Sequence, residues 1–183
     1  MILAFLSLLW ASEPTAHWQV LQEQPTRVAC VSPDSWCQAS IVSTCSLEQL
    51  EKKILDFAGY KRIFPHTRQV KAIDKHTVYI RIDMPLLYAD RDYVIRFATE
   101  RKADTLVLSF TSMSSAMALQ KDVIRIDDMA GSWTFHRLSK GSKVVYKWNS
   151  DYRLDVPKLM KPKVRIRQGV GVLESLRQLC ASK

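Results

Sequence analysis

The sequence predicts an α+β fold in which a curved antiparallel β-sheet packs against a long C-terminal helix. Between residues 69 and 152, segment after segment alternates apolar and polar side chains, as half-buried strands do. After Pro162 the apolar side chains instead recur at helical spacing. Short turns between the strands favour antiparallel pairing. A sheet of this size tends to curl, and the last helix is the natural filler of its concave face.

Length and composition indicate one globular domain, which we expect to span residues 17–181. The chain is 47% hydrophobic and 25% charged, with no low-complexity run, a composition that argues against disorder. The formal net charge of +9 favours anionic partners such as lipid head groups or nucleic acid, without choosing between them.

The first eleven residues are almost wholly apolar and end at a polar segment, Ser12–Pro14. Such a run is too short to span a bilayer, which needs about 20 residues. It fits the apolar region of a secretory signal peptide with Leu9-Trp10-Ala11 as the cleavage site, although no Lys or Arg precedes it. We therefore expect residues 1–11 to be a signal peptide and the protein to be exported, periplasmic or secreted. If the segment is not a signal, a cytoplasmic location follows.

The N-terminal part predicts three short strands and then a helix. The strands are expected over His17–Leu21, Thr26–Val31 and Trp36–Thr44. Ser46 and Gln49 form a capping box, and the apolar residues at helical spacing behind it are Leu47, Leu50, Ile54 and Phe57. We expect Gly59 to end this additional helix, near residues 46–58, as a left-handed cap and Tyr60–Pro65 to form a turn.

Two cysteines flank the turn-forming residues Ser32–Ser35. A hairpin around this turn places Cys30 opposite Cys37, at a separation suited to a disulfide. In a cytosolic protein two small buried thiols would be the preferred interpretation. Cys45 and Cys180 could form a second pair, which the sequence alone leaves open.

The sheet itself is predicted from seven further segments and the helix that follows them. The strand segments are Gln69–Ile73, Val78–Ile82, Tyr93–Phe97, Leu106–Thr111, Val123–Asp127, Ser132–Leu138 and Lys143–Tyr152. Gly169 and Gly171 interrupt the last helix, each at a cost of about 1 kcal/mol against alanine. Close approach to another surface or to a ligand would explain their presence.

Large apolar side chains in phase along these strands are the candidate ligand-binding residues. The strands supply more of them than one glycine-interrupted helix would cover, and apolar pockets are common ligand sites. Taken singly, each residue is as easily explained as core. The candidates are Ile80, Ile82, Tyr93, Ile95, Phe97, Leu108, Phe110, Trp133, Phe135, Tyr146 and Trp148 on strands, Met84 and Leu87 in an apolar loop, and Val172 and Leu176 on the helix.

No catalytic residue, metal site or cofactor is expected. The carboxylates of Asp90 and Asp92 point to one face of a strand and Arg91 to the other, which favours structural ion pairs over a convergent site. The four histidines show no metal-ligand spacing, and no Cys-x-x-Cys motif occurs.

A basic run precedes and opens the last helix. Its charges spread over two sides of a helix, so we expect no nucleic-acid partner. A solvated segment is the simplest interpretation, and transient docking to an anionic membrane surface is the functional one, at about 1 kcal/mol per basic residue. The apolar loops at residues 84–90 and 111–120 could form a lid beside it. The run consists of Lys158, Lys161, Lys163, Arg165 and Arg167.

Local motifs along most of the chain resemble those of START-type lipid-binding domains of the helix-grip (polyketide cyclase/START, SRPBCC) superfamily. The most specific is Asp90–Val94 behind a proline-bearing apolar loop. The others are Leu55-Asp56, Tyr60, Phe64-Pro65-His66, Pro85, Gly131-Ser132-Trp133, Val145-Tyr146 and Pro157. The chain departs from bacterial relatives at Ile63, where they often carry Trp. The resemblance implies a helix-grip fold with a ligand tunnel between sheet and last helix, and binding of one hydrophobic molecule, often a lipid.

The sequence thus predicts a binding protein that carries, and transfers, a hydrophobic ligand. One alternative is a cyclase/dehydratase-type enzyme on the same fold, which needs an acid or base inside the cavity. The other is an adaptor that binds through its basic surface and has a solid core. Ligand identity and oligomeric state are not encoded in any recognisable pattern.

Overall fold

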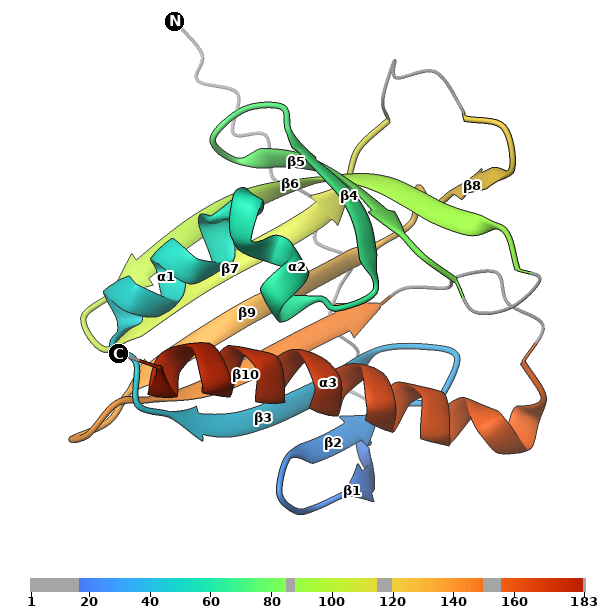
Figure 1. The fold of residues 1–183 in the computed structure, drawn as a ribbon. Coiled ribbons are helices and arrows are strands. Elements are labelled where there is room, and N and C mark those ends of the chain that lie inside the picture. The colour runs from blue at the N-terminus through green and yellow to red at the C-terminus, as the bar shows by residue number, and fades with distance from the viewer. Residues whose placement is uncertain (1–16, 85–87, 115–119, 150–155, 183) are drawn as a thin grey trace, which may run out of the picture.

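A computed structural model describes residues 17–84, 88–114, 120–149 and 156–182. The predicted signal peptide and Leu87 lie outside these residues. The elements shown in Figure 1 are, in chain order, β1 (Gln19–Gln22), β2 (Arg27–Cys30), β3 (Cys37–Ser43), α1 (Leu47–Leu55), the 3₁₀ turn η1 (Phe57–Gly59), α2 (Tyr60–Ile63), β4 (Thr67–Ala72), β5 (Thr77–Ile82), β6 (Asp90–Lys102), β7 (Thr105–Ser112), β8 (Val123–Arg125), β9 (Ala130–Arg137), β10 (Ser142–Asn149), the 3₁₀ turn η2 (Lys158–Met160) and α3 (Lys161–Ala181).

The strands form one sheet in the order β1-β2-β3-β10-β9-β7-β6-β5-β4. Neighbours on this path are antiparallel, which confirms the predicted fold class. The short strand β8 differs from the expected meander, because it pairs parallel with the start of β6 through Asp90↔Val123 and Asp92↔Arg125. Ten residues separate the end of β7 from the start of β8, which is longer than a hairpin turn. The chain can therefore reach the start of β6 and run parallel to it.

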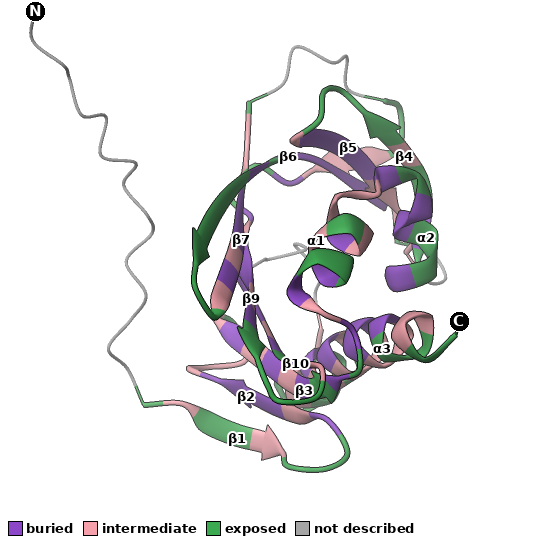
Figure 2. Ribbon diagram, turned by 90° about the vertical axis from the view of Figure 1, so that its left-hand side faces the viewer, coloured by how far each residue is buried: buried purple, intermediate pink, exposed green. Residues whose placement is uncertain are grey.

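The sheet is strongly curved and the three helices fill its concave side (Figure 2). The helix α1 packs on β7 and β9, whereas α3 runs along β2 and β3 and contacts α2. The predicted long C-terminal helix therefore packs on the concave side of the sheet, and the shorter helices lie beside it. The buried apolar core occupies the space between these layers.

The helix α1 begins as predicted and ends earlier than predicted. The Ser46 Oγ accepts from the Gln49 amide at 3.3 Å, and the Gln49 side chain accepts from the Ser46 amide at 2.9 Å, which completes the capping box. Gly59 is not a left-handed cap, because its φ is −82°. The Asp56 carboxylate instead accepts from the Gly59 amide at 3.3 Å and starts η1, so the chain continues into α2 where a turn was predicted.

The two glycines of α3 have different environments. A Cβ on Gly169 would lie 2.9 Å from both the Ala39 Cβ and the Trp148 Cη2, so the helix touches the sheet at this residue. A Cβ on Gly171 would meet nothing within 4 Å. Close approach therefore accounts for Gly169 and not for Gly171.

Two disulfides join the described cysteines. Cys30 and Cys37 lie opposite each other in the β2–β3 register and their sulfurs are bonded at 2.00 Å. Cys45 and Cys180 are bonded as well, with a Cα–Cα distance of 5.4 Å, and this bond ties the end of α3 to the start of α1. Such bonds are compatible with an exported protein.

None of the helices in the described part of the chain has the length and apolar character needed to cross a membrane.

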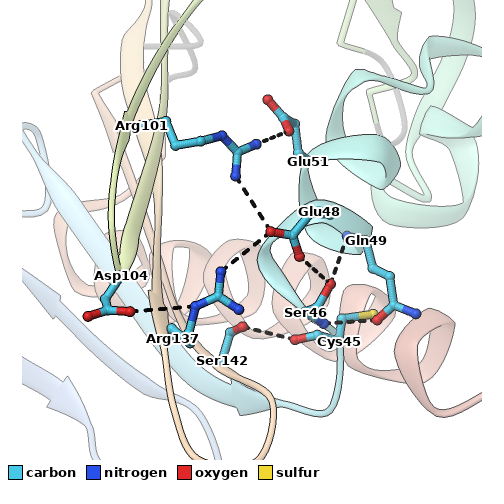
Figure 3. Close-up of polar contacts among 9 residues, drawn as sticks. All are labelled: Cys45, Ser46, Glu48, Gln49, Glu51, Arg101, Asp104, Arg137 and Ser142. Atoms are coloured by element: carbon cyan, nitrogen blue, oxygen red, sulfur yellow. Dashed lines mark hydrogen bonds and ion pairs between the residues drawn. The ribbon is translucent and has the colours of Figure 1, made fainter.

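Ion pairs join α1 to the sheet close to the Cys45–Cys180 disulfide (Figure 3). Glu51 pairs with Arg101, and Glu48 lies 3.4 Å from Arg137 and 3.7 Å from Arg101. The Ser142 hydroxyl also donates to the Cys45 carbonyl at 2.9 Å. Exposed pairs of this kind contribute at most about 1 kcal/mol each. These ion pairs, the Ser142 hydrogen bond and the Cys45–Cys180 bond all lie at one end of the molecule, which is called the tied end below.

Candidate ligand-binding face

The predicted ligand-binding residues of the sheet converge on its concave side. Among those that the structure describes, Ile82 and Met84 are partly buried and the others are buried. Val172 and Leu176 of α3 belong to the same buried cluster as the strand residues. The residues of this concave side are called the apolar face from here on.

The strand register divides the apolar face into successive rows from the tied end outward. The first row joins Leu106, Phe135, Val144 and Ile41, and the next joins Leu108, Trp133, Tyr146 and Ala39. A third row runs through Phe97, Phe110, Gly131, Trp148 and Cys37. Beyond it the face continues on β5 and β6 through the cross-strand pairs Val78↔Ile95, Ile80↔Tyr93 and Ile82↔Arg91. The last of these rows is called the far row below.

Aromatic rings in the middle rows contact one another. Tyr146 stacks on Trp133 at a centroid distance of 4.3 Å and on Trp148 at 4.9 Å. Phe110 lies 5.6 Å from Phe97 and 6.4 Å from Tyr146. A Cβ on Gly131 would lie 2.3 Å from the Phe110 ring, so glycine is what permits this ring to lie flat over the strand. The result is a continuous aromatic surface from β6 to β10.

One polar group that could have oriented a ligand instead holds the last helix. The Trp148 indole donates to the Gln168 side-chain oxygen at 3.1 Å, and the same oxygen accepts from Arg165 at 3.3 Å. Arg165 also donates to the Pro33 carbonyl at 2.8 Å, and Lys161 lies 2.5 Å from Asp34. The first turns of α3 are therefore attached to the β2–β3 turn.

The two carboxylates of the Asp-Arg-Asp sequence form buried ion pairs on the outer face of the sheet. Arg81 donates to Asp90 at 2.6 Å, and Arg125 holds Asp92 through two bonds of 2.6 and 2.9 Å. Burial alone would raise the pKa of Asp90. The bond and charge of Arg81, with the charge of Arg68, outweigh it and hold that pKa below its ordinary value.

Arg91 lies on the opposite side from these carboxylates, in phase with Tyr93, Ile95 and Phe97. The residue is only 2% exposed, and its guanidinium donates to the Ala89 carbonyl. Burial lowers the pKa of Arg91, although a guanidinium remains a cation at neutral pH. The sequence reasoning placed Arg91 opposite the carboxylates and did not include it on the apolar face. Strand alternation, the signal that selected Tyr93, could have found it.

A groove elsewhere on the molecule has a different chemistry. An open groove of about 440 Å³ between the β1–β2 turn, β3 and the last turns of α3 is lined largely by charged and polar side chains, such as Glu23, Arg27, Lys143, Glu174 and Arg177. This lining does not suit an apolar ligand. No group of three or more His, Cys, Asp or Glu in the described ranges could hold a metal ion.

Comparison with known proteins identifies the fold. No protein-family model and no curated protein sequence matches the chain. Among solved structures, the STAR-related lipid transfer protein fragment from Xanthomonas axonopodis is similar over 90% of this chain and 99% of its own, with a TM-score of 0.78 and 17% identity.

Two further solved structures agree with this assignment. Human StAR-related lipid transfer protein 5 covers 91% of this chain and 88% of its own, with a TM-score of 0.76 and 14% identity. A START superfamily protein from Mycobacterium smegmatis covers 80% of this chain and 97% of its own, with a TM-score of 0.56 and 10% identity. The fold is thus that of START-type domains, as the sequence motifs predicted.

Proposed function

From the START-type fold of the chain we propose that the protein binds one hydrophobic molecule, a lipid, between the sheet and α3, and transfers it between membranes. The observation that carries the proposal is the apolar face itself. It continues beyond the aromatic rows to Ile82, which is partly buried and packed against the core, and the partly buried Met84 follows two residues later in the chain. Burying an acyl chain there would contribute about 25 cal/mol per Å² before ordering costs.

The ligand enters, in this proposal, at the far row and not at the tied end. At the tied end a disulfide and the ion pairs of Glu48 and Glu51 join α1, α3 and the sheet. Hydrogen bonds and one ion pair to the β2–β3 turn hold the first turns of α3. These contacts are individually weaker than a covalent bond, so helix and loop motion at this end would open the apolar face at the lower cost. The lid predicted from loops 84–90 and 111–120 belongs to this part of the proposal, and Leu87 lies in the portion that the structure does not describe.

A membrane-docking surface lies where α3 begins. Leu159 is 90% exposed and Met160 is 45% exposed, which is unusual for large apolar side chains next to each other. Lys158 and Lys163 are exposed beside them and form no ion pair with any described residue. Exposed apolar side chains next to cations that pair with no described residue match the surface of an anionic bilayer. Transient contact there would let a lipid enter or leave without crossing water.

Catalysis of the cyclase/dehydratase kind is not favoured by a specific observation. The buried carboxylates of Asp90 and Asp92 are engaged by Arg81 and Arg125 on the outer face of the sheet. They therefore do not reach the apolar face, where an acid or base would have to act. We also propose export of the protein, supported by the two disulfides and the apolar N-terminal segment.

Uptake of a pyrene-labelled acyl lipid from phosphatidylcholine vesicles tests the proposal. After the vesicles are removed by centrifugation, we expect pyrene fluorescence to remain with the protein. Met84→Asp places a charge at the edge of the apolar face and is expected to reduce uptake about tenfold, because desolvating a carboxylate opposes binding. Val42→Asp, at a residue that is 61% exposed on β3, is the matched control and should bind normally. Equal, background-level fluorescence for wild type and both variants would reject the proposal.

A further inference from the structure

The strand β3 has an open backbone edge in the polar groove between the β1–β2 turn and the last turns of α3. The pairing of β2 with β3 ends at Arg27↔Ser40, whereas β3 continues to Ser43. Figure 1 shows β3 extending past the β1–β2 turn on this side of the molecule. From Ile41 onward, β3 therefore pairs with β10 alone among the described strands.

The backbone of Val42 faces this open side. Val31 donates to the Trp36 carbonyl at 2.9 Å, which makes these two residues a hydrogen-bonded pair of the β2–β3 hairpin. Because such pairs alternate along antiparallel strands, every second residue of β3 after Trp36 turns its N–H and C=O toward β2. Val42 belongs to this series and has no partner on β2, all of which the structure describes. Continuing the register would place Pro25 opposite it, and proline has no N–H to donate.

The walls of the groove are joined to each other within the protein. The buried Thr26 hydroxyl donates to Glu174 Oε1 at 2.8 Å and connects the β1–β2 turn to α3. Arg177 donates to Glu174 Oε2 at 2.8 Å, and the disulfide of Cys180 fixes the end of the same helix. The groove of about 440 Å³ is thus formed before a ligand binds. A preformed site loses less free energy to ordering than one that has to be assembled.

The charges that line the groove favour an acidic ligand. Both carboxylates already have a cation beside them, since Glu23 pairs with Arg27 and Glu174 pairs with Arg177. Lys143 lines the same groove, is exposed and forms no ion pair with any described residue. The lining therefore has one more cation than carboxylates, in a chain whose net charge is +9. Such an excess attracts acidic partners.

We propose that an extended peptide segment of another protein, with an acidic residue next to an apolar one, adds to β3 as a further strand in this groove. Its backbone exchanges hydrogen bonds with the N–H and C=O of Val42, as in other cases of strand addition to an open edge. Its apolar side chain packs beside that of Val42, which is 61% exposed. The acidic side chain meets the excess positive charge of the lining. This binding site is separate from the apolar face and does not depend on lipid binding.

Selection of a phage-displayed library of random seven-residue peptides on the full-length protein tests the proposal. Enriched peptides are then synthesised with a fluorescent label and their affinities are measured by fluorescence anisotropy. We expect them to combine acidic and apolar residues and to bind more weakly as salt rises, because the charges are exposed and screened.

Two variants and a control locate the peptide on the protein. Val42→Pro removes the open N–H and leaves the ladder to β10 intact, so binding should weaken about threefold to tenfold, as the loss of one hydrogen bond predicts. Lys143→Glu should also weaken binding of the acidic peptides, without any change to the backbone. Lys71→Glu makes the same charge change at an exposed residue of β4, on the opposite edge of the sheet, and should bind as wild type does.

Three results would overturn the assignment. The first is a selection that enriches no peptide above the uncoated surface. The second is enriched peptides that bind Lys143→Glu, or folded Val42→Pro, as tightly as wild type, because they then bind elsewhere. The third is wild type that sediments as a dimer while Val42→Pro sediments as a monomer, which would assign the open edge to a second copy of the chain.

Discussion

Gly169 and Gly171 show how one helix can carry two glycines for different reasons. At Gly169 an added Cβ would meet the Ala39 Cβ and the Trp148 ring at 2.9 Å, so the helix can lie this close to the sheet only without a side chain. At Gly171 the same atom would have free space. Of the two glycines, only Gly169 therefore permits the close contact between helix and sheet.

Substituting each glycine by alanine should have unequal effects on stability. Gly171→Ala is expected to raise the free energy of unfolding by up to about 1 kcal/mol, through helix propensity. Gly169→Ala gains the same propensity but overpacks the contact with the sheet, and its free energy of unfolding should lie about 1–3 kcal/mol below that of Gly171→Ala. Urea denaturation of the two variants measures this difference. Equal effects would show that α3 does not depend on close contact at Gly169.

Single residues were predictable from the sequence where strand alternation alone decides their environment. Period-2 alternation placed Tyr93, Phe97 and Trp133 on the buried side correctly. It did not reveal that the Trp148 indole bonds to Gln168, because that contact joins residues from separate elements. The end of α1 was missed for a local reason, since the Asp56 side chain captures the Gly59 amide and redirects the chain before a glycine cap is needed.

The two ends of helix α3 are attached to the rest of the molecule in different ways. Its last turn is covalently tied to the start of α1 through Cys45–Cys180. Its first turns are held without a covalent bond among the described residues, through Arg165 and Lys161 to the β2–β3 turn and through Gln168 to Trp148. This asymmetry agrees with an entrance at the far row. It was not visible in the sequence, where the pairing of Cys45 remained open and strand pairings such as that of β8 with β6 have no local signal.

Removing each disulfide should therefore have unequal effects on stability. The cysteines of Cys45–Cys180 are 135 residues apart and those of Cys30–Cys37 only 7. The chain-entropy estimate assigns them about 5 and about 2.5 kcal/mol respectively, as upper values. We expect Cys45→Ser/Cys180→Ser to lower the urea midpoint more than Cys30→Ser/Cys37→Ser. A larger loss for the short hairpin pair would contradict the tethering role given to the C-terminal bond.

The whole molecule has two chemically distinct ends, one closed by α1 and its ion pairs and one where α3 begins with exposed Leu159 and Met160. The charge of +9 predicted an anionic partner, and exposed cations with no ion-pair partner among the described residues lie beside these apolar side chains. This placement required the structure, because the helical wheel of the basic run shows no single stripe. In three dimensions Lys161 and Arg165 bond within the protein. Lys158, Lys163 and Arg167 are exposed and form no ion pair with any described residue, so these are the cations that the proposed docking would use.

Docking to membranes should depend on these side chains jointly. Leu159→Asp/Met160→Asp is expected to weaken binding to phosphatidylcholine vesicles that contain phosphatidylglycerol by about tenfold or more, because burial of each apolar side chain is lost. Binding of wild type should fall as salt rises, since the cations act through screened charge. Vesicle sedimentation measures both effects, with Val42→Asp as the control. Salt-independent binding that the double variant retains would exclude this docking surface.

Native mass spectrometry of the purified full-length protein, before and after incubation with vesicles, tests the central claim most directly. We predict a complex with one lipid molecule, whose identity organic extraction then reveals, and a fraction in this form that increases after incubation. A spectrum that shows only the mass of the unliganded protein, both as purified and after incubation, would contradict lipid binding on the apolar face.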